Sequence, residues 1–496
     1  MAKEEDNSEK NQHVNELKEP EDNIVQSHHN VVIDGKEINY TVTTGTMVLS
    51  EEEEEDEKSK GEKAKASIFF VAYTRDEAEE SNKRPITFSF NGGPGSSSVW
   101  LHLGVLGPRK IELDDDGYPL PPPYRLMDNN YSLLDVTDLV FIDPVSTGFS
   151  RAVPGEKPKE FHGFKKDIES VGDFIRLYTT RYQRWGSPKF LIGESYGTTR
   201  ASGLAGYLQD RHGYFLNGIM FISTVLDFQT LLFNIGNDLP YILFLPTYTA
   251  TAWYHERLDE ELQKDLRKTL DQAEAFALGE YASALLKGSS LKADEHQQIV
   301  SQLARFTGLS SEYVEQANLR ISIDRYVKEL LRSRRLTVGR LDSRFTGVDR
   351  DAAGEIFEFD PSYAAILGPF TATLNDYIRG ELNFEKDIPY EILTDRVHPW
   401  SFKEHQNEYV YVAETLRKAM AMNSHLNVFV ANGYFDLATP YLATTYTFNH
   451  LSLEPKMQKQ ISMGFYQAGH MMYIHKPSLA QLKEDLQGFI ISSRPA

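Results

Sequence analysis

The stretch Ser187–Thr199, SPKFLIGESYGTT, decides how the rest of the chain is interpreted. Its apolar run Phe190–Ile192, which follows a proline, predicts a buried strand. The next residues, Gly193–Gly197, match the pattern G-x-S-x-G and lead into helix-forming residues. A strand, a sharp turn and a helix form the setting in which such a serine exposes its hydroxyl. Ser195 is therefore a candidate nucleophile, although a five-residue match alone is weak evidence.

The composition indicates a globular protein that is larger than one ordinary core. The chain has 496 residues, of which 41% are hydrophobic, so we expect a large domain with an insertion or several domains. It contains no cysteine, which excludes disulfide bonds, thiolate catalysis and cysteine-bound metals. A net charge of −20 disfavours nucleic acid and anionic membranes as partners, and half of this excess lies in residues 1–65.

The N-terminal residues, MAKEEDNSEKNQH, are polar and lack the apolar segment of a secretory signal. No run approaches the roughly 18 apolar residues of a membrane span. Together with the absence of cysteine, these features predict a soluble protein of the reducing cytoplasm.

Apolar patterning divides the chain into four parts. Residues 1–30 lack periodicity and are expected to form a disordered acidic tail. Residues 31–226 show strands and then alternating strands and helices, a pattern typical of an α/β domain with a mixed sheet. Residues 227–382 are mostly helical and predict an inserted cap, and the α/β signals return in residues 383–496.

Three segments have no settled role at this level. Residues 51–65, a run of acids followed by lysines, predict a solvated hairpin loop, with a docking site for a basic partner as the alternative. The aromatic-rich segment Asp238–His255 either lines a substrate pocket or forms the core of the insertion. Arg332–Gly354 is rich in arginine and punctuated by glycine.

A glycine-rich loop, Asn91–Gly95, follows the predicted strand Pro85–Phe90. Three glycines in five residues suit a backbone that must approach another group closely. A phosphate cradle is disfavoured because no Gly-Lys-Ser/Thr follows. The remaining interpretations are an oxyanion loop, which in hydrolases follows an early strand, and a purely structural turn.

An acid and a histidine stand in comparable positions near the C-terminus. Asp436 follows the predicted strand Asn427–Ala431, and His470 follows Gln460–Phe465. A nucleophilic serine needs a base within reach and a group that orients the base. The order serine, acid, histidine, each at a strand end, is the order found in α/β-hydrolases.

These residues lie in blocks that resemble the serine carboxypeptidase family of α/β-hydrolases, from about Val32 to the C-terminus. The blocks are NGGPGSSS at Asn91–Ser98 with LGP at Leu106–Pro108, GESYG at Gly193–Gly197, GYFDLATP at Gly433–Pro440 and AGHMMYIHKPSLA at Ala468–Ala480. The resemblance is to a cysteine-free, bacterial-type member. It implies an α/β-hydrolase fold with a mixed, mostly parallel central sheet and an inserted, mainly helical cap domain.

The resemblance also implies the chemistry. Ser195 would be the nucleophile, His470 the base and Asp436 the orienting acid, with the N–H groups of Gly93 and Tyr196 forming the oxyanion hole. The reaction would release C-terminal residues from peptides through an acyl-enzyme. No metal and no cofactor are expected, because a triad needs none, and the oligomeric state is not indicated.

Family members recognise the substrate's free carboxylate with an asparagine and glutamic acids, and Asn91 and Glu194 match two of these positions. We expect burial to raise the pKa of Glu194, so that binding weakens as the pH rises. The chain departs from the family at Val105, where a second glutamic acid is common, at Ser89 in place of tryptophan and at Ser96 in place of cysteine. Two alternatives therefore stay open: a serine esterase, amidase or acyltransferase with the same triad, and a non-enzymatic interaction protein.

Overall fold

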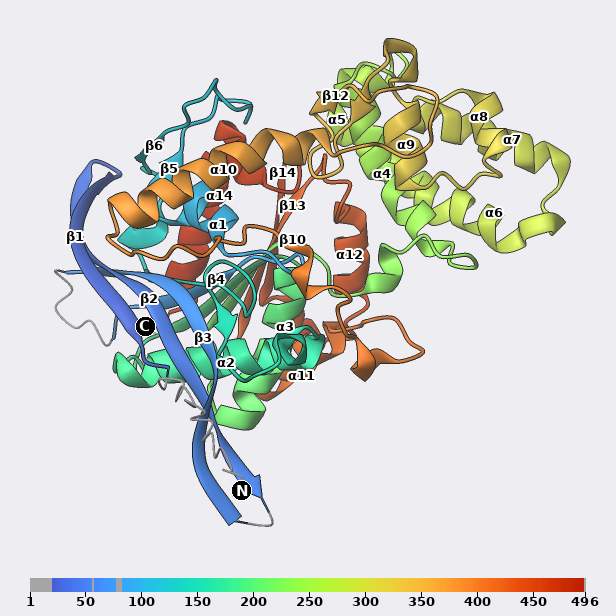
Figure 1. Ribbon diagram of the computed structural model, residues 1–496. Coiled ribbons are helices and arrows are strands. Elements are labelled where there is room, and N and C mark those ends of the chain that lie inside the picture. The colour runs from blue at the N-terminus through green and yellow to red at the C-terminus, as the bar shows by residue number, and fades with distance from the viewer. Residues whose placement is uncertain (1–19, 56–57, 77–82, 495–496) are drawn as a thin grey trace, which may run out of the picture.

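The computed structural model describes residues 20–55, 58–76 and 83–494. A large body built around a twisted sheet carries a helical lobe on one side (Figure 1). In Figure 1 the lobe contains α4 to α9, and a long two-stranded arm projects from the opposite end of the body.

The central sheet crosses the whole body. Its strands are β1 (Asn23–Ile33), β2 (Lys36–Glu55), β3 (Lys58–Arg75), β4 (Ile86–Phe90), β7 (Asp138–Ile142), β8 (Arg151–Ala152), β9 (Lys189–Ser195), β10 (Gly218–Thr224), β13 (Asn427–Gly433) and β14 (Ile461–Tyr466). Within the described residues, the order is β1-β2-β3-β7-β4-β9-β10-β13-β14, and β8 pairs with β3. Pairing from β7 to β14 is parallel, whereas β1, β2, β3 and β7 are antiparallel. The sheet is thus mixed and mostly parallel, as predicted.

Two short ribbons lie outside this sheet, one formed by β5 (Arg109–Ile111) and β6 (Leu126–Asp128), the other by β11 (Thr337–Val338) and β12 (Thr346–Gly347). The helices are α1 (Val99–Leu101), α2 (Phe164–Arg181), α3 (Tyr196–His212), α4 (Leu239–Tyr254), α5 (Leu266–Phe276), α6 (Ala282–Lys287), α7 (Ala293–Thr307), α8 (Ser311–Gln316), α9 (Ile323–Glu329), α10 (Pro361–Gly380), α11 (Ala413–Met422), α12 (Tyr441–Asn449), α13 (Pro455–Gln458) and α14 (Lys476–Ser492).

Helices cover both faces of the parallel strands. One buried cluster joins the sheet to α2, α3 and α11, and a second joins it to α1, α10 and α14. Strands that are buried on both faces require nearly continuous apolar runs, as in β4 (ITFSF) and β7 (DLVFI), where every residue is buried. Because β9, β10, β13 and β14 pair in parallel, the carboxyl ends of β9, β13 and β14 lie at the same edge of the sheet, where the candidate residues are found.

The helical lobe has its own core, but that core is shorter than the predicted insertion. The insertion contributes residues from Leu243 to Val338 to a third buried cluster. Helix α10 was expected to belong to the cap, yet its buried residues Ile366, Phe370 and Leu374 pack in the core of the body. The Phe370 ring lies 4.9 Å from that of Trp100 in α1. The predicted boundary at residue 382 thus lies too far along the chain, because helical periodicity does not reveal which core a helix faces.

The N-terminal region also differs from our expectation. Residues 1–19 of the expected tail lie outside the described residues. Residues 23–30, however, belong to β1, which pairs with β2 along its whole length. Because an edge strand of an antiparallel pair can expose one face to solvent, it can accommodate this polar sequence.

Residues 51–65 do not form a loop as predicted. β2 continues to Glu55 and β3 begins at Lys58, so the strands pair through most of this segment. Acids on β2 lie near lysines on β3: the Glu53 carboxylate is 2.7 Å from Lys65 Nζ and 3.3 Å from Lys63 Nζ. Opposite charges on neighbouring strands favour pairing, which explains why a charged run forms a ribbon.

No helix in the described part of the chain combines the length and the apolar character that crossing a membrane requires.

Candidate active site

Ser195 lies at the junction of β9 and α3 with a strained backbone. Its φ is 59° and its ψ is −129°, a conformation that is uncommon for residues other than glycine. The flanking glycines permit the tight turn: a Cβ at Gly193 would lie 2.2 Å from the Gly197 carbonyl oxygen, and a Cβ at Gly197 would lie 2.9 Å from that of Phe90. The predicted strand, turn and helix are present, and Ser195 lines an open cavity at this edge of the sheet.

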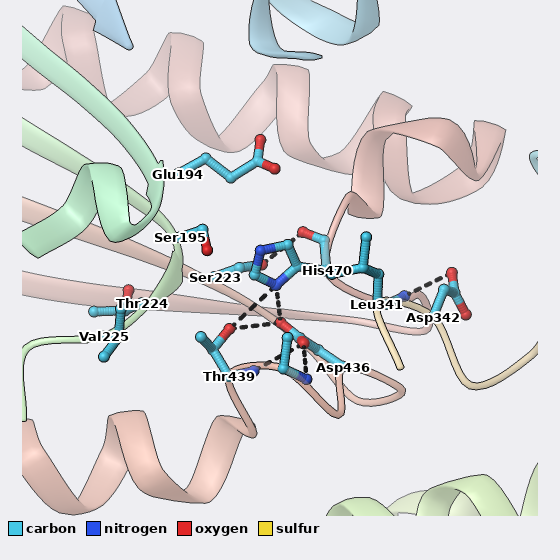
Figure 2. Close-up of polar contacts among 12 residues, drawn as sticks. Glu194, Ser195, Ser223, Thr224, Val225, Leu341, Asp342, Asp436, Thr439 and His470 are labelled. Atoms are coloured by element: carbon cyan, nitrogen blue, oxygen red, sulfur yellow. Dashed lines mark hydrogen bonds and ion pairs between the residues drawn. The ribbon is translucent and has the colours of Figure 1, made fainter. Parts of the chain in front are cut away.

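Asp436 and His470 meet at the ends of β13 and β14. The Nδ1 atom of His470 lies 2.8 Å from Asp436 Oδ2. The other Asp436 oxygen accepts hydrogen bonds from the N–H groups of Ala438 and Thr439, at 2.8 and 2.9 Å, and the Thr439 hydroxyl donates to Oδ2. Because Nδ1 faces the carboxylate, Nε2 is left to accept a proton. Figure 2 shows Ser195 beside the imidazole ring, and both residues line the cavity.

The electrostatic environment favours a basic histidine. Burial opposes a charged imidazole, but the Asp436 carboxylate and its hydrogen bond, helped by Glu194, outweigh this cost and raise the pKa of His470 above its usual value. A base of raised pKa accepts the hydroxyl proton of a serine more readily.

The glycine-rich loop lies directly against the serine turn. A Cβ at Gly92 would lie only 2.4 Å from the backbone nitrogen of Tyr196. Gly93 adopts a φ of 98°, and Gly93 and Tyr196 both line the cavity. The Tyr196 N–H is the first of α3 and has no acceptor within the helix. The arrangement suits an oxyanion loop.

Glu194 and Asn91 form a buried polar pair beside the triad. Burial, the largest influence, raises the pKa of Glu194 to about 7. The Tyr473 hydroxyl donates to Glu194 Oε2 over 2.6 Å. Asn91 Oδ1 accepts from the Leu101 N–H, and the Asn91 side chain acts as a hydrogen-bond donor that lowers the pKa of Glu194 against the effect of burial. Glu194 and Asn91 are both buried and both line the cavity, so a polar ligand group that enters the cavity would meet them.

Comparisons with known proteins agree with this geometry. A model of the serine carboxypeptidase family matches residues 58–476. The chain belongs to this family. Its relatives include the pheromone-processing carboxypeptidase KEX1 of Saccharomyces cerevisiae, 31% identical over 135 residues, and serine carboxypeptidase-like 29 of Arabidopsis thaliana, 28% identical over 124 residues. These matches cover 26% and 24% of this chain but only 17% and 24% of the two relatives.

A solved structure shows the fold of the family. The crystal structure of KEX1Δp, a prohormone-processing carboxypeptidase from Saccharomyces cerevisiae, matches with a TM-score of 0.58 and 17% identity over 91% of both chains. The predicted α/β-hydrolase fold is therefore confirmed.

Sequence reasoning missed Tyr473, a tyrosine inside the last family block. The family's second glutamic acid would stand at Val105, but Val105 is 1% exposed in the core of the body and does not line the cavity. Tyr473 instead supplies the partner of Glu194. Nothing in its spacing singled it out, since it belongs to a short helical turn rather than to a strand end.

Ser96, at the position of the family cysteine, has a structural contact. Its Oγ accepts a hydrogen bond of 2.8 Å from Trp100 Nε1, and both residues line the cavity. Ser89, at the tryptophan position, is buried within β4.

The cavity over the triad measures about 470 Å³. Its walls are mainly apolar and include Val225, Phe228, Leu231, Leu232, Phe244 and Ile323. Of the aromatic segment Asp238–His255, Phe244 reaches the cavity, whereas Leu243 and Tyr248 are buried inside the cap. Both interpretations of that segment are therefore partly right. Among the residues that the structure describes, no group of three or more acids or histidines is arranged to hold a metal ion.

Proposed function

We propose that this protein is a serine-type carboxypeptidase that removes C-terminal residues from peptides. The observation that carries the proposal is that the buried residues Glu194 and Asn91 line the same cavity as Ser195 and His470, with Asp436 hydrogen-bonded to His470. Membership of the serine carboxypeptidase family supports it.

In the proposed reaction, His470 Nε2 removes the proton from Ser195 Oγ as this oxygen attacks the last peptide carbonyl. The N–H groups of Gly93 and Tyr196 stabilise the negative oxygen of the tetrahedral intermediate. His470 then gives its proton to the leaving amine, and the C-terminal amino acid departs. Water repeats the sequence on the acyl-enzyme and releases the shortened peptide.

Glu194 and Asn91 would select the free carboxylate of the substrate. With a pKa of about 7, Glu194 carries a proton below neutral pH and can donate a hydrogen bond to a carboxylate. Above that pH it becomes an anion that repels the substrate. Catalysis fails at the other limit, at low pH, where His470 is protonated. Because the pKa of His470 is also raised, the two titrations overlap, and the activity should peak near neutral pH and fall on both sides.

The test compares a peptide that ends in a free acid with the same peptide as its C-terminal amide. At pH 7 we expect release of the last residue from the acid alone, and none from either peptide with Ser195→Ala. Equal cleavage of acid and amide would favour the alternative, a serine esterase, amidase or acyltransferase. The observation that favours this alternative is Val105, which stands where family members commonly have a second glutamic acid.

The location in the cytoplasm also remains a proposal. A chain of 496 residues without cysteine fits a reducing compartment, where no disulfide is needed. Cell fractionation with an antibody tests it.

A further inference from the structure

The arginine-rich segment that received no role from the sequence lies between the two loops that carry the acid and the histidine. We call Gly339–Phe345, which connects β11 to β12, the strap. The strap contacts both residues adjacent to Asp436: the Phe435 carbonyl accepts from the Ser343 N–H over 2.9 Å, and the Leu437 N–H donates to the Arg340 carbonyl over 3.1 Å.

The strap contacts the histidine loop just as closely. The His470 N–H donates to the Leu341 carbonyl over 2.7 Å, and the Gly469 N–H donates to Asp342 Oδ2 over 3.0 Å. Figure 2 shows Leu341 and Asp342 beside His470, on the side away from Ser195. A Cβ at Gly469 would lie 2.5 Å from the Asp342 Cα, so the two backbones are in direct contact.

Asp342 is held rigidly for this contact. Its side chain is buried. Arg344 donates two hydrogen bonds to it, from Nη2 to Oδ2 over 2.7 Å and from Nε to Oδ1 over 3.0 Å. The Ser362 hydroxyl accepts from the Asp342 N–H over 3.1 Å. Because a buried carboxylate is destabilised when it loses a partner, these hydrogen bonds favour one orientation of Asp342 and of the loop bonded to it.

We propose that Asp342 is a positioning residue for catalysis, which fixes the His470 loop against the Asp436 loop through the Gly469 N–H. This inference rests on the proposed triad but not on the proposed choice of substrate. A displacement of about 1 Å in a catalytic group can cost a factor of about 10² in rate.

The test measures hydrolysis of an activated ester, which requires the triad but no carboxylate recognition. If the wild-type protein hydrolyses no ester, the proposed triad chemistry fails rather than the role of Asp342. For Asp342→Ala we expect kcat per folded molecule to fall by about 10²-fold with KM within about twofold. Asp342→Asn keeps the size of the side chain but weakens its hydrogen bonds with Arg344. It should lower kcat per folded molecule by a smaller factor, again with little change in KM.

The pH profile separates positioning from general damage. Burial lowers the pKa of His470, and so does Arg340, whereas Asp436 and Glu194 raise it. A histidine freed from Asp436 returns toward its ordinary, lower pKa. The acid limb of kcat should therefore move to lower pH in both variants.

Asp349→Asn is the matched control. Asp349 is also a buried aspartate in an ion pair, but it binds Lys328 and Thr337 in the cap. The Asp349→Asn substitution should lower the melting temperature and leave the acid side of the pH profile of kcat unchanged. Our inference is overturned if the Asp342 variants keep the wild-type acid limb, or if their kcat per folded molecule falls no further than that of the control.

Discussion

At the scale of single residues, the candidate site combines two buried side chains whose surroundings favour different charge states. Glu194 is buried beside the triad and resists ionisation, whereas His470 is buried beside an acid and favours its charged form. The environment thereby suits Glu194 to the proposed recognition of a carboxylate and His470 to the proposed transfer of protons.

Tyr473 is the residue whose contribution is most easily isolated. Its hydrogen bond lowers the pKa of Glu194 against the effect of burial, so Tyr473→Phe should raise that pKa further. Binding of free-acid peptides should then persist to higher pH, which the pH dependence of KM for a blocked dipeptide measures. An unchanged midpoint would contradict the assigned contact. Glu194→Gln, which cannot ionise, should give a flat profile in the same range.

At the scale of elements, the turn between β9 and α3 depends on glycine. In Gly197→Ala the added methyl would press against the backbone of Phe90 and Asn91, which cannot rotate away. Overpacking of this kind costs about 1–3 kcal/mol, so we expect a clear loss of stability in urea unfolding. Gly279→Ala is the control, because nothing lies within 4 Å of the added carbon. Equal effects of the two substitutions would refute the tight contact.

Helix α10 provides a second prediction at this scale. Phe370 is fully buried against Trp100, and a Phe→Ala change in such a site costs about 3–5 kcal/mol. Leu367 lies on the same helix but is 37% exposed, so Leu367→Ala should lower the free energy of unfolding much less. The comparison, made by denaturant unfolding, shows whether α10 stabilises the body. Similar decreases in the free energy of unfolding for both variants would contradict the packing of α10 in the core of the body.

Sequence reasoning succeeded where periodicity or a motif reports a local constraint. The strand, turn and helix around Ser195 and the strand ends at Asp436 and His470 were predicted because parallel strands are apolar throughout and the glycines cannot be replaced. It failed where the answer depends on distant contacts. The charged ribbon at residues 51–65, the placement of α10 and the contact between Tyr473 and Glu194 all join parts of the chain that no local pattern relates.

At the scale of the whole molecule, the strap connects the cap to the loops that carry Asp436 and His470. Ser343 Oγ lies 2.7 Å from Thr251 Oγ1, and the His255 Nε2 atom lies 2.7 Å from the Ser343 carbonyl oxygen. Both partners lie on or directly after α4, the helix whose Phe244 lines the cavity. Cap, cavity wall and catalytic loops thus form one continuous network of contacts.

The most direct test of the central claim is the ratio of kcat/KM for a free-acid peptide to that for its amide, measured from pH 5 to pH 9. Glu194 with a pKa of about 7 predicts a large ratio in acid that falls as the pH rises through neutrality. In Glu194→Gln the ratio should lose this pH dependence. A ratio near one at every pH in the wild-type protein would contradict carboxylate recognition by Glu194 and Asn91, and with it the proposed function.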